Sequence, residues 1–309
     1  MDFKSKIFLI SGPTASGKSA FAIKLAKKIN GEIINADSMQ VYKELKILTA
    51  RLDPKKYQKI KHHLYGFQSV KKNFSTGDWL KLAVKKIKEL KKRKKTPIFV
   101  GGTGLYFKAL TDGLVEIPKI PIEYRKKVRN IHKTLGQKKF FQQLLKLDPQ
   151  VQDMIDMTDS QRSIRAYEVK KFTKKSIYKW FKETKPYFKE NDFFKIYIDF
   201  PRQELVKRID TRTKKMIKIG AIEEVKKFNK LKIRKDKSAN KIIGVNEIRK
   251  YLNNEKKLSE IKEKISVKTR QYAKRQRTWA RGQMREWNIY NYRHLNKVSN
   301  FIRSMKNYQ

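Results

Sequence analysis

Short apolar runs recur along the chain and predict its strands. The runs at 6–10, 32–36, 97–100 and 194–199 have the length and the branched aliphatic content of buried strands. The sequence between them carries apolar residues at helical spacing. Because strands that alternate with helices usually form a parallel sheet wound with helices, the pattern predicts an α/β fold of the kind that carries phosphate loops.

The strand pattern disappears between residues 118 and 192. Pro118 and Pro121 open this stretch, and Lys-rich helical sequence follows. We therefore predict that residues 118–192 form an all-helical insertion domain. The α/β core would consist of residues 1–117 and 193–309.

Three helical patterns within the core are long enough to interpret individually. A helix over 79–92 buries one apolar face, and Thr76 is placed to cap it. Two longer helical stretches, at about 202–229 and 255–281, follow the last predicted strand and complete the core.

The sequence after the first predicted strand matches a phosphate loop. Gly12 and Gly17-Lys18-Ser19 fit the pattern G-x-x-x-x-G-K-[ST], with a strand before them and a helix after them. In such a loop, backbone N–H groups point at phosphate oxygens, Lys18 reaches the outer phosphate and the Ser19 hydroxyl favours Mg²⁺. The loop predicts a bound diphosphate or triphosphate without specifying the reaction. The candidate phosphate-binding residues are Gly12, Pro13, Thr14, Ala15, Ser16, Gly17, Lys18 and Ser19.

Polar residues also follow the next two predicted strands. The second strand ends at Asp37-Ser38-Met39-Gln40 and the third at Gly101-Gly102-Thr103-Gly104. Since ligands of open α/β sheets bind at the carboxyl ends of the strands, a carboxylate, a hydroxyl and the phosphate loop are expected in one cleft. On the residues alone, Asp37 could equally cap a helix or sit near a metal, and the glycines could simply form a tight turn.

Charge points to a polyanionic partner. The chain of 309 residues has 77 Lys and Arg against 29 Asp and Glu, a net charge of +48. Such an excess is typical of nucleic-acid binding, although a genome rich in A and T would also raise the lysine content. The absence of cysteine excludes disulfides and thiolate zinc sites. No run reaches the roughly 18 apolar residues of a membrane span, so we expect a soluble, cytoplasmic protein.

Several longer segments resemble one family. They read "GPTASGKS", "ADSMQVYKELKILTA", "HHLYGF", "VGGTGLYFKAL", "QRSIRAYEV", "RIDTRTKKMIKIGAIEEV" and "TRQYAKRQRTWAR". Their order and spacing resemble the tRNA dimethylallyltransferase family (isopentenyltransferase, or IPP transferase) of bacterial type, from about residue 6 to residue 282.

The resemblance implies transfer of a dimethylallyl group from dimethylallyl diphosphate to N6 of adenosine 37 in tRNA. That adenosine lies just 3′ of the anticodon, in tRNAs that read codons beginning with U, and the products are N6-isopentenyladenosine and diphosphate. Asp37 matches the general base and Thr103 a threonine beside the site, while Lys18 and Mg²⁺, held in part by Ser19, would stabilise the leaving diphosphate. The expected partner is the anticodon stem-loop, and the expected state is a monomer.

The resemblance also implies a set of tRNA contacts. They are Asp37, Ser38, Met39, Gln40, Thr103, Arg125, Gln161, Arg162, Ser163, Ile164, Arg165, Lys241 and Gly244. The chain departs from the usual family pattern at Leu48, where a glycine is common, at Arg51, and at Val245, where a tyrosine is common. These departures leave the path of the 42–52 loop and the fit of tRNA near Val245 open.

Three other functions would use some of the same sequence features. A phosphate-loop kinase of a nucleoside or small metabolite would use Lys18 and Ser19 and bind ATP, but it would have no need of such a basic chain. An enzyme that prenylates free adenine nucleotides would need neither the insertion nor the charge. A non-catalytic RNA-binding protein would have no use for Asp37.

Overall fold

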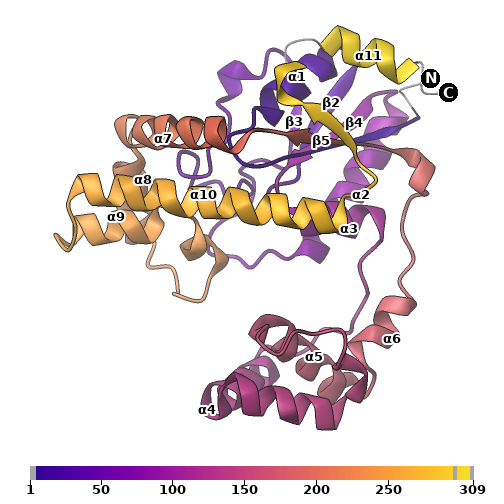
Figure 1. Ribbon diagram of the computed structural model, residues 1–309, viewed down its shortest axis with the longest axis vertical. Coiled ribbons are helices and arrows are strands. Elements are labelled where there is room, and N and C mark those ends of the chain that lie inside the picture. Colours follow the sequence, from indigo (N-terminus) through magenta and orange to yellow (C-terminus); the bar gives the residue numbers. More distant parts are fainter. Residues whose placement is uncertain (1–4, 295–297, 307–309) are drawn as a thin grey trace. The chain divides into compact units, whose positions relative to one another are not determined.

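The computed structural model describes residues 5–294 and 298–306. It divides the chain into two compact units, one made of Met1–Thr111 with Phe188–Gln309 and the other of Asp112–Tyr187 (Figure 1). The strands are β1 (Ile7–Ser11), β2 (Gly31–Asn35), β3 (His62–His63), β4 (Thr96–Gly101), β5 (Phe193–Asp199) and β6 (Asn288–Asn291). The helices of the first unit are α1 (Lys18–Lys28), α2 (Thr76–Lys92), α3 (Gly104–Thr111), α7 (Arg202–Lys218), α8 (Ala221–Lys230), α9 (Val245–Leu252), α10 (Leu258–Gln283) and α11 (Val298–Lys306).

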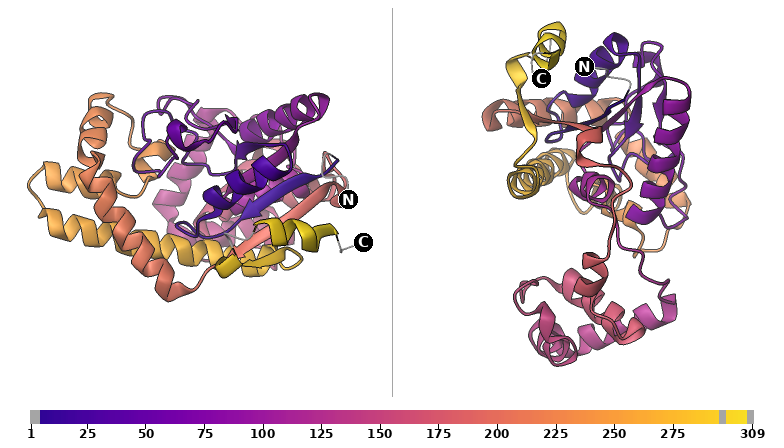
Figure 2. Two further views of the ribbon diagram at one scale, coloured as in Figure 1. Left: turned by 90° about the horizontal axis from the view of Figure 1, so that it is seen from above. Right: turned by 90° about the vertical axis from the view of Figure 1, so that its right-hand side faces the viewer.

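The first unit is built on a six-stranded sheet in the order β3-β2-β4-β1-β5-β6. Every pairing is parallel, and Figure 2 shows helices packed around the sheet. In the described residues the sequence thus forms the α/β fold that its pattern predicts, with an all-helical insertion.

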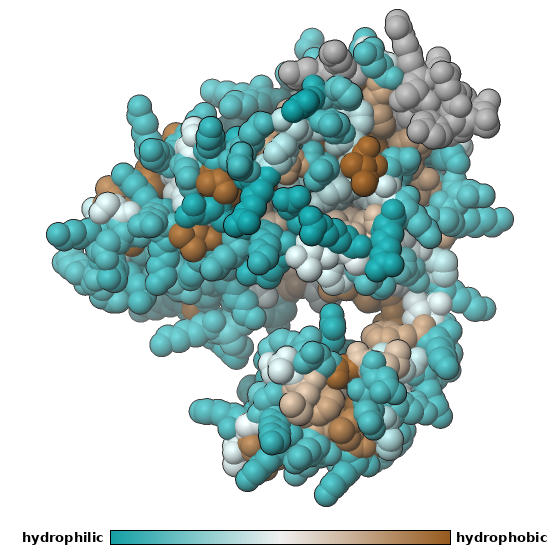
Figure 3. Space-filling view, viewed as in Figure 1, coloured by the Kyte–Doolittle hydropathy of each residue, from teal (hydrophilic) through white to brown (hydrophobic). Residues whose placement is uncertain are grey.

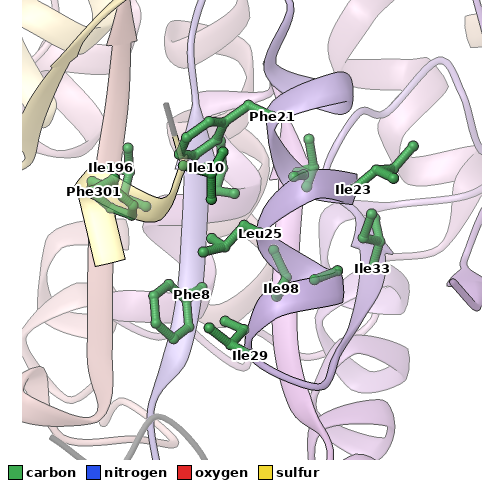
Figure 4. Close-up of a cluster of buried hydrophobic side chains, with 14 of the residues drawn as sticks. Phe8, Ile10, Phe21, Ile23, Leu25, Ile29, Ile33, Ile98, Ile196 and Phe301 are labelled. Atoms are coloured by element: carbon green, nitrogen blue, oxygen red, sulfur yellow. The ribbon is translucent and has the colours of Figure 1, made fainter. Parts of the chain in front are cut away.

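Aliphatic and aromatic residues of β1 and α1 form the centre of the core (Figure 4). Phe8 and Ile10 of β1 and Leu25 of α1 have no exposed surface. Phe21 of α1 packs edge-on against Phe301 of α11, with ring centroids 5.6 Å apart. Because this core fixes α1 on β1, it also fixes the loop between them, which is the predicted phosphate loop.

Strand register brings the carboxyl ends of β1, β2 and β4 level with one another. Ser11 pairs with Gly101, and Asn35 pairs with Val100. A Cβ atom on Gly101 would lie 2.0 Å from the Ala36 carbonyl oxygen, so only glycine allows this approach of the two strand ends. The segments after these strands therefore meet at one edge of the sheet.

Some predicted elements differ from the structure. The stretch 202–229 is two helices rather than one, because Gly220 adopts φ 106° between α7 and α8. Ser75 caps α2 instead of Thr76, in a capping box with Asp78. The sequence pattern missed β3 and β6, which are short and only partly buried.

The second unit contains α4 (Ile122–Leu147), α5 (Ser160–Thr173) and α6 (Ile177–Lys182), around an apolar core of its own. Leu144 and Val169 are fully buried there. The boundaries expected from the sequence, 118 and 192, lie a few residues after those of this compact unit. The difference arises because the segments that connect the two units have no clear hydrophobic periodicity from which a boundary could be predicted.

Hydrophilic side chains cover most of the face shown in Figure 3 on each unit. Within the described residues, no helix is both long and apolar enough to cross a membrane.

Candidate active site

A cavity of about 680 Å³ lies in the first unit, at the carboxyl ends of β1, β2 and β4. Its lining comes from the phosphate loop, from the segments after β2 and β4, and from α7 and α10. Asp37, Ser38, Met39, Gln40, Thr103 and Lys241 all line it, together with Thr14, Ala15, Gly17, Lys18 and Ser19. The phosphate loop and the polar strand ends predicted from the sequence thus share one cavity.

The phosphate loop has the backbone conformation that its glycines permit. Gly17 has φ 89° and directly precedes α1, and Ala15 also has a positive φ of 65°. A Cβ atom on Gly12 would lie 3.0 Å from the Ile198 carbonyl oxygen. Gly12, Pro13 and Ser16 support the loop from outside the cavity lining, and the buried Ser16 hydroxyl has no hydrogen-bond partner in the described structure.

Lys18 is the first residue of α1 and lines the cavity. Its Nζ donates a hydrogen bond to the Pro13 carbonyl oxygen at 3.1 Å. Burial lowers its pKa to about 8, an effect that Asp37 opposes and Arg212 reinforces. At pH 7 the lysine is still mostly charged, and an anion bound in the loop would raise its pKa again, so the side chain is suited to hold phosphate.

Arg212 of α7 is a site residue that the sequence did not reveal. It lines the cavity, and its Nη1 donates to the Thr14 hydroxyl at 3.0 Å. Burial lowers its pKa, while Asp37 acts in the opposite direction. Arg208, one turn earlier on the same helix, lines the cavity too. Two arginines four residues apart are a weak signal in a chain with 77 Lys and Arg.

Asp37 is held by hydrogen bonds at the end of β2. Its backbone N–H donates to Asn35 Oδ1 at 2.9 Å, and its Oδ1 accepts the Met39 N–H at 2.9 Å. Its carboxylate therefore stabilises a local turn and does not cap a helix. Thr103 Oγ1 accepts the Ser38 N–H at 2.9 Å, which ties this turn to the segment after β4.

Helix α10 places further polar groups against the same turns. Gln276 hydrogen-bonds Thr14 and Gly102, and Tyr272 lies within hydrogen-bonding reach of Thr103 and Gln276. Burial raises the pKa of the Tyr272 hydroxyl, with a smaller contribution from Asp37. The tyrosine therefore stays protonated at any ordinary pH.

The 42–52 loop has a defined path despite its departures from the family pattern. Leu48 is buried and lies against Gly244, where a Cβ atom would be 2.6 Å from Leu48 Cδ2. The backbone N–H groups of Ile47 and Leu48 donate to the Glu224 carboxylate at 2.7 and 2.9 Å. Arg51 donates to the Tyr42 carbonyl oxygen at 2.9 Å. These contacts anchor the loop on α8 and α9.

Val245 and Gly244, which were expected near tRNA, help to form the start of α9. Val245 is fully buried in the first turn of α9, so a core contact stands where a tyrosine is common. Gly244 precedes that helix with φ 103°, and it is not part of the cavity lining.

The predicted tRNA contacts of the second unit gather around α5. Gln161 and Arg162 are exposed. Arg125 Nε and Arg165 Nη1 lie 3.2 and 3.5 Å from Oε2 of the same buried carboxylate, Glu168. Ile164 is half-buried, and Ser163 has no exposed surface and donates to the Asp159 carbonyl oxygen at 2.8 Å. Ser163 therefore supports the start of α5 rather than facing a ligand.

The donors at the cavity fit a metal that is shared with phosphate. Among the described residues, no three His, Asp or Glu side chains form a metal-binding group. The Ser19 hydroxyl, next to Lys18 and on the cavity wall, is the kind of single protein ligand that a phosphate-bound Mg²⁺ uses.

The fold and the cavity define an α/β protein in which a loop with the phosphate-loop sequence pattern and the carboxylate-bearing Asp37 line one cavity. The family model described as IPP transferase matches residues 40–283. The chain is 60% identical, over 93% of its own length and 92% of the relative's, to the tRNA dimethylallyltransferase of Pelagibacter ubique (strain HTCC1062). It therefore belongs to the IPP transferase family, as the sequence motifs predict, and is an enzyme of the prenyltransferase class.

Two solved structures resemble the chain closely. The tRNA isopentenylpyrophosphate transferase from Bacillus halodurans has a TM-score of 0.69 and 31% identity, with 97% of this chain and 96% of that chain covered. A eukaryotic dimethylallyltransferase acting on tRNA has a TM-score of 0.81 and 27% identity, with 93% of this chain and 74% of that chain covered. Both support the fold described above.

Proposed function

We propose that this chain transfers the dimethylallyl group of dimethylallyl diphosphate to N6 of adenosine 37 in tRNAs that read codons beginning with U. The products are N6-isopentenyladenosine and diphosphate. One observation carries the proposal: the phosphate loop, Asp37 and Thr103 line a single cavity. The names of the similar proteins, which include a tRNA dimethylallyltransferase and an enzyme acting on tRNA, support the same substrate class.

The phosphate side of the cavity stabilises the leaving group. As the allylic C–O bond breaks, negative charge grows on diphosphate and positive charge on the prenyl carbon. The N–H groups of the loop, Lys18 and Arg212 are placed around that negative charge before the reaction starts. When bound, Mg²⁺ supplies further charge neutralisation, with Ser19 as its protein ligand.

The carboxylate side activates the acceptor. The adenine N6 lone pair is delocalised into the ring, so the amine attacks effectively only as its proton leaves. Asp37 takes that proton as the N–C bond forms, a contribution of about 10²–10⁴-fold to the rate. Thr103 accepts the Ser38 N–H and so fixes the Asp37–Gln40 turn, whose side chains line the cavity and would orient the base.

The adenine has to leave the anticodon stack to reach a donor in this cavity. Met39 and Gln40 line the cavity next to Asp37, where an extruded base would enter. Gln161, Arg162, Arg125 and Arg165 of the second unit provide cationic and polar groups for the stem-loop backbone. A monomer in the cytoplasm, where tRNA is found, is the expected working form.

The test measures label transfer from dimethylallyl diphosphate to an anticodon stem-loop that contains A36-A37, with Mg²⁺ present. Wild type should label the RNA, and Asp37→Asn should lower kcat by about 10²–10⁴-fold. Asp153→Asn, at an exposed carboxylate of the second unit, is the matched control and should keep full activity. An A37-to-G37 RNA should stay unlabelled.

Parallel reactions separate the alternatives. Label transferred to AMP but not to RNA would identify a nucleotide prenyltransferase. Phosphoryl transfer from ATP, with no prenyl transfer, would identify a kinase. RNA binding without either reaction would leave only a binding function.

A further inference from the structure

One side chain of α10 connects the two turns that flank the cavity. Gln276 Oε1 accepts the Thr14 N–H at 2.7 Å, and Gln276 Nε2 donates to the Gly102 carbonyl oxygen at 3.0 Å. Gln276 is 9% exposed; its bond to Gly102 is buried and its bond to Thr14 is partly buried, so water competes little for either. The phosphate loop after β1 and the turn after β4 are thus joined through a residue more than 170 positions away in the sequence.

The glycines of the β4 turn leave the space that α10 fills. A Cβ atom on Gly102 would lie 2.0 Å from Gln276 Nε2, and one on Gly104 would lie 2.0 Å from Trp279 Nε1. Both side chains line the cavity. The close approach shows that α10 and this turn are fitted to each other.

The same helix reaches the acceptor side of the cavity. Tyr272 lies within hydrogen-bonding reach of both Gln276 and Thr103, and Thr103 accepts the Ser38 N–H. Ser38 directly follows Asp37. Gln276 therefore joins the phosphate loop to Gly102, and the next residue, Thr103, is hydrogen-bonded to the turn that holds Asp37.

We propose that Gln276 is a positioning residue that fixes the phosphate loop and the Asp37–Thr103 side in one relative geometry. The proposal rests on the proposed function, because it concerns the alignment of the prenyl carbon with the adenine N6. Gln276 accepts a hydrogen bond from the Thr14 N–H. It therefore fixes the edge of the phosphate loop and does not touch the reacting atoms. A misplacement of about 1 Å between reacting groups can cost about 10²-fold in rate, which is the scale of effect expected here.

Gln276→Met keeps the approximate volume and removes both hydrogen bonds. We expect kcat to fall about 10–100-fold. We also expect inorganic diphosphate to bind about 2–10-fold more weakly, since the loop loses its pre-organisation. The KM for tRNA should change little, because the side chain is buried away from solvent. Gln271→Met, at an exposed position of the same helix, is the matched control and should resemble wild type.

Gln276→Glu tests the two bonds separately. The ionised carboxylate can still accept the Thr14 N–H, but it repels the Gly102 carbonyl oxygen, whereas the protonated carboxyl can donate to it. Burial raises the pKa of such a carboxyl, so protonation should occur at accessible pH. The ratio of kcat for Gln276→Glu to kcat for wild type should therefore rise about tenfold from pH 8 to pH 6. The corresponding ratio for Gln276→Met should stay flat.

The outcomes are distinct. Unchanged kcat and unchanged diphosphate affinity in Gln276→Met would overturn the proposal, as would a flat pH ratio for Gln276→Glu. If Gln276→Met failed to fold, the pH ratio of Gln276→Glu would still decide. If wild type transferred no prenyl group, the proposed function would fail, whereas calorimetric titration with inorganic diphosphate would still show whether Gln276 holds the loop.

Discussion

Lys18 is expected to support the reaction while destabilising the free protein. Its ammonium group is largely removed from water, Asp37 only partly offsets this cost, and the nearby Arg212 adds to it. In the folded chain its pKa is about 8, against 10.5 for an unperturbed lysine. At about 1.4 kcal/mol per pH unit, the charged side chain costs the folded state at most about 3.5 kcal/mol at neutral pH.

Two effects reduce that figure for Lys18→Met. Lys18 keeps part of its surface exposed, so solvent screens some of the cost. The substitution also removes the hydrogen bond to the Pro13 carbonyl oxygen, worth about 1 kcal/mol. We therefore expect Lys18→Met to raise the free energy of unfolding by about 1–2 kcal/mol at pH 7.

The sign of the pH dependence follows from the lowered pKa. Between about pH 8 and 10.5 the unfolded chain binds a proton at Lys18 that the folded chain does not, so the folded wild type gains stability as pH rises. The advantage of Lys18→Met should thus be largest at or below pH 7 and should shrink at pH 9.5. Urea unfolding at both values, with the exposed Lys27→Met of the same helix as control, measures this difference.

When inorganic diphosphate is present, wild type should be more stable to unfolding than Lys18→Met. A ligand that binds only the folded state adds stability in proportion to its affinity, and wild type should bind it more tightly than Lys18→Met. If Lys18→Met were no more stable than wild type at pH 7 without ligand, the buried ammonium group of Lys18 would not destabilise the folded state, which would refute the prediction.

Three further predictions follow from the site. Gly102→Ala should lower stability by about 1–3 kcal/mol in thermal unfolding and reduce transfer, because its Cβ would lie 2.0 Å from Gln276 Nε2; wild-type values would show that α10 can move aside. Arg212→Met should weaken inorganic diphosphate binding by about 1.5–3 kcal/mol, the value of a charge-assisted hydrogen bond, in calorimetric titration, and an unchanged affinity would remove Arg212 from the phosphate site. The affinity for the anticodon stem-loop should fall about 10³-fold or more between 50 and 200 mM salt if about six or more phosphates are contacted, and a flat response would assign the lysine excess to genome composition.

The sequence predicted those parts of the site that are encoded locally. The phosphate loop needs a strand, two glycines and a helix within about twenty residues. Its pattern can therefore be recognised without knowledge of the rest of the fold. Asp37 and Thr103 could be placed because parallel strands end at one edge of the sheet, and the register of β2 and β4 does bring them together.

The contacts that distant helices make at the cavity could not be predicted residue by residue. Arg212 resembles the many solvent-exposed cations of the chain until the fold buries it next to Thr14. Gln276 stands in one of the family-like segments, but its two hydrogen bonds could not be foreseen, because they depend on the absence of a side chain at Gly102. Edge strand β6 is mostly exposed and so lacks the apolar run that marked the inner strands.

The place of β1 in the sheet has a consequence for synthesis on the ribosome. β1 is an inner strand whose neighbours are β4 and β5, yet β5 begins at Phe193, after the whole helical unit. At about 5–20 residues per second, one edge of β1 stays without its partner for roughly 10–40 s after β1 itself is made. All five residues of that strand are buried in the finished protein, so the nascent chain carries an apolar, unpaired strand edge for that time. The helical unit, with its own core, can fold during this interval, and we expect chaperone demand to fall only once β5 emerges.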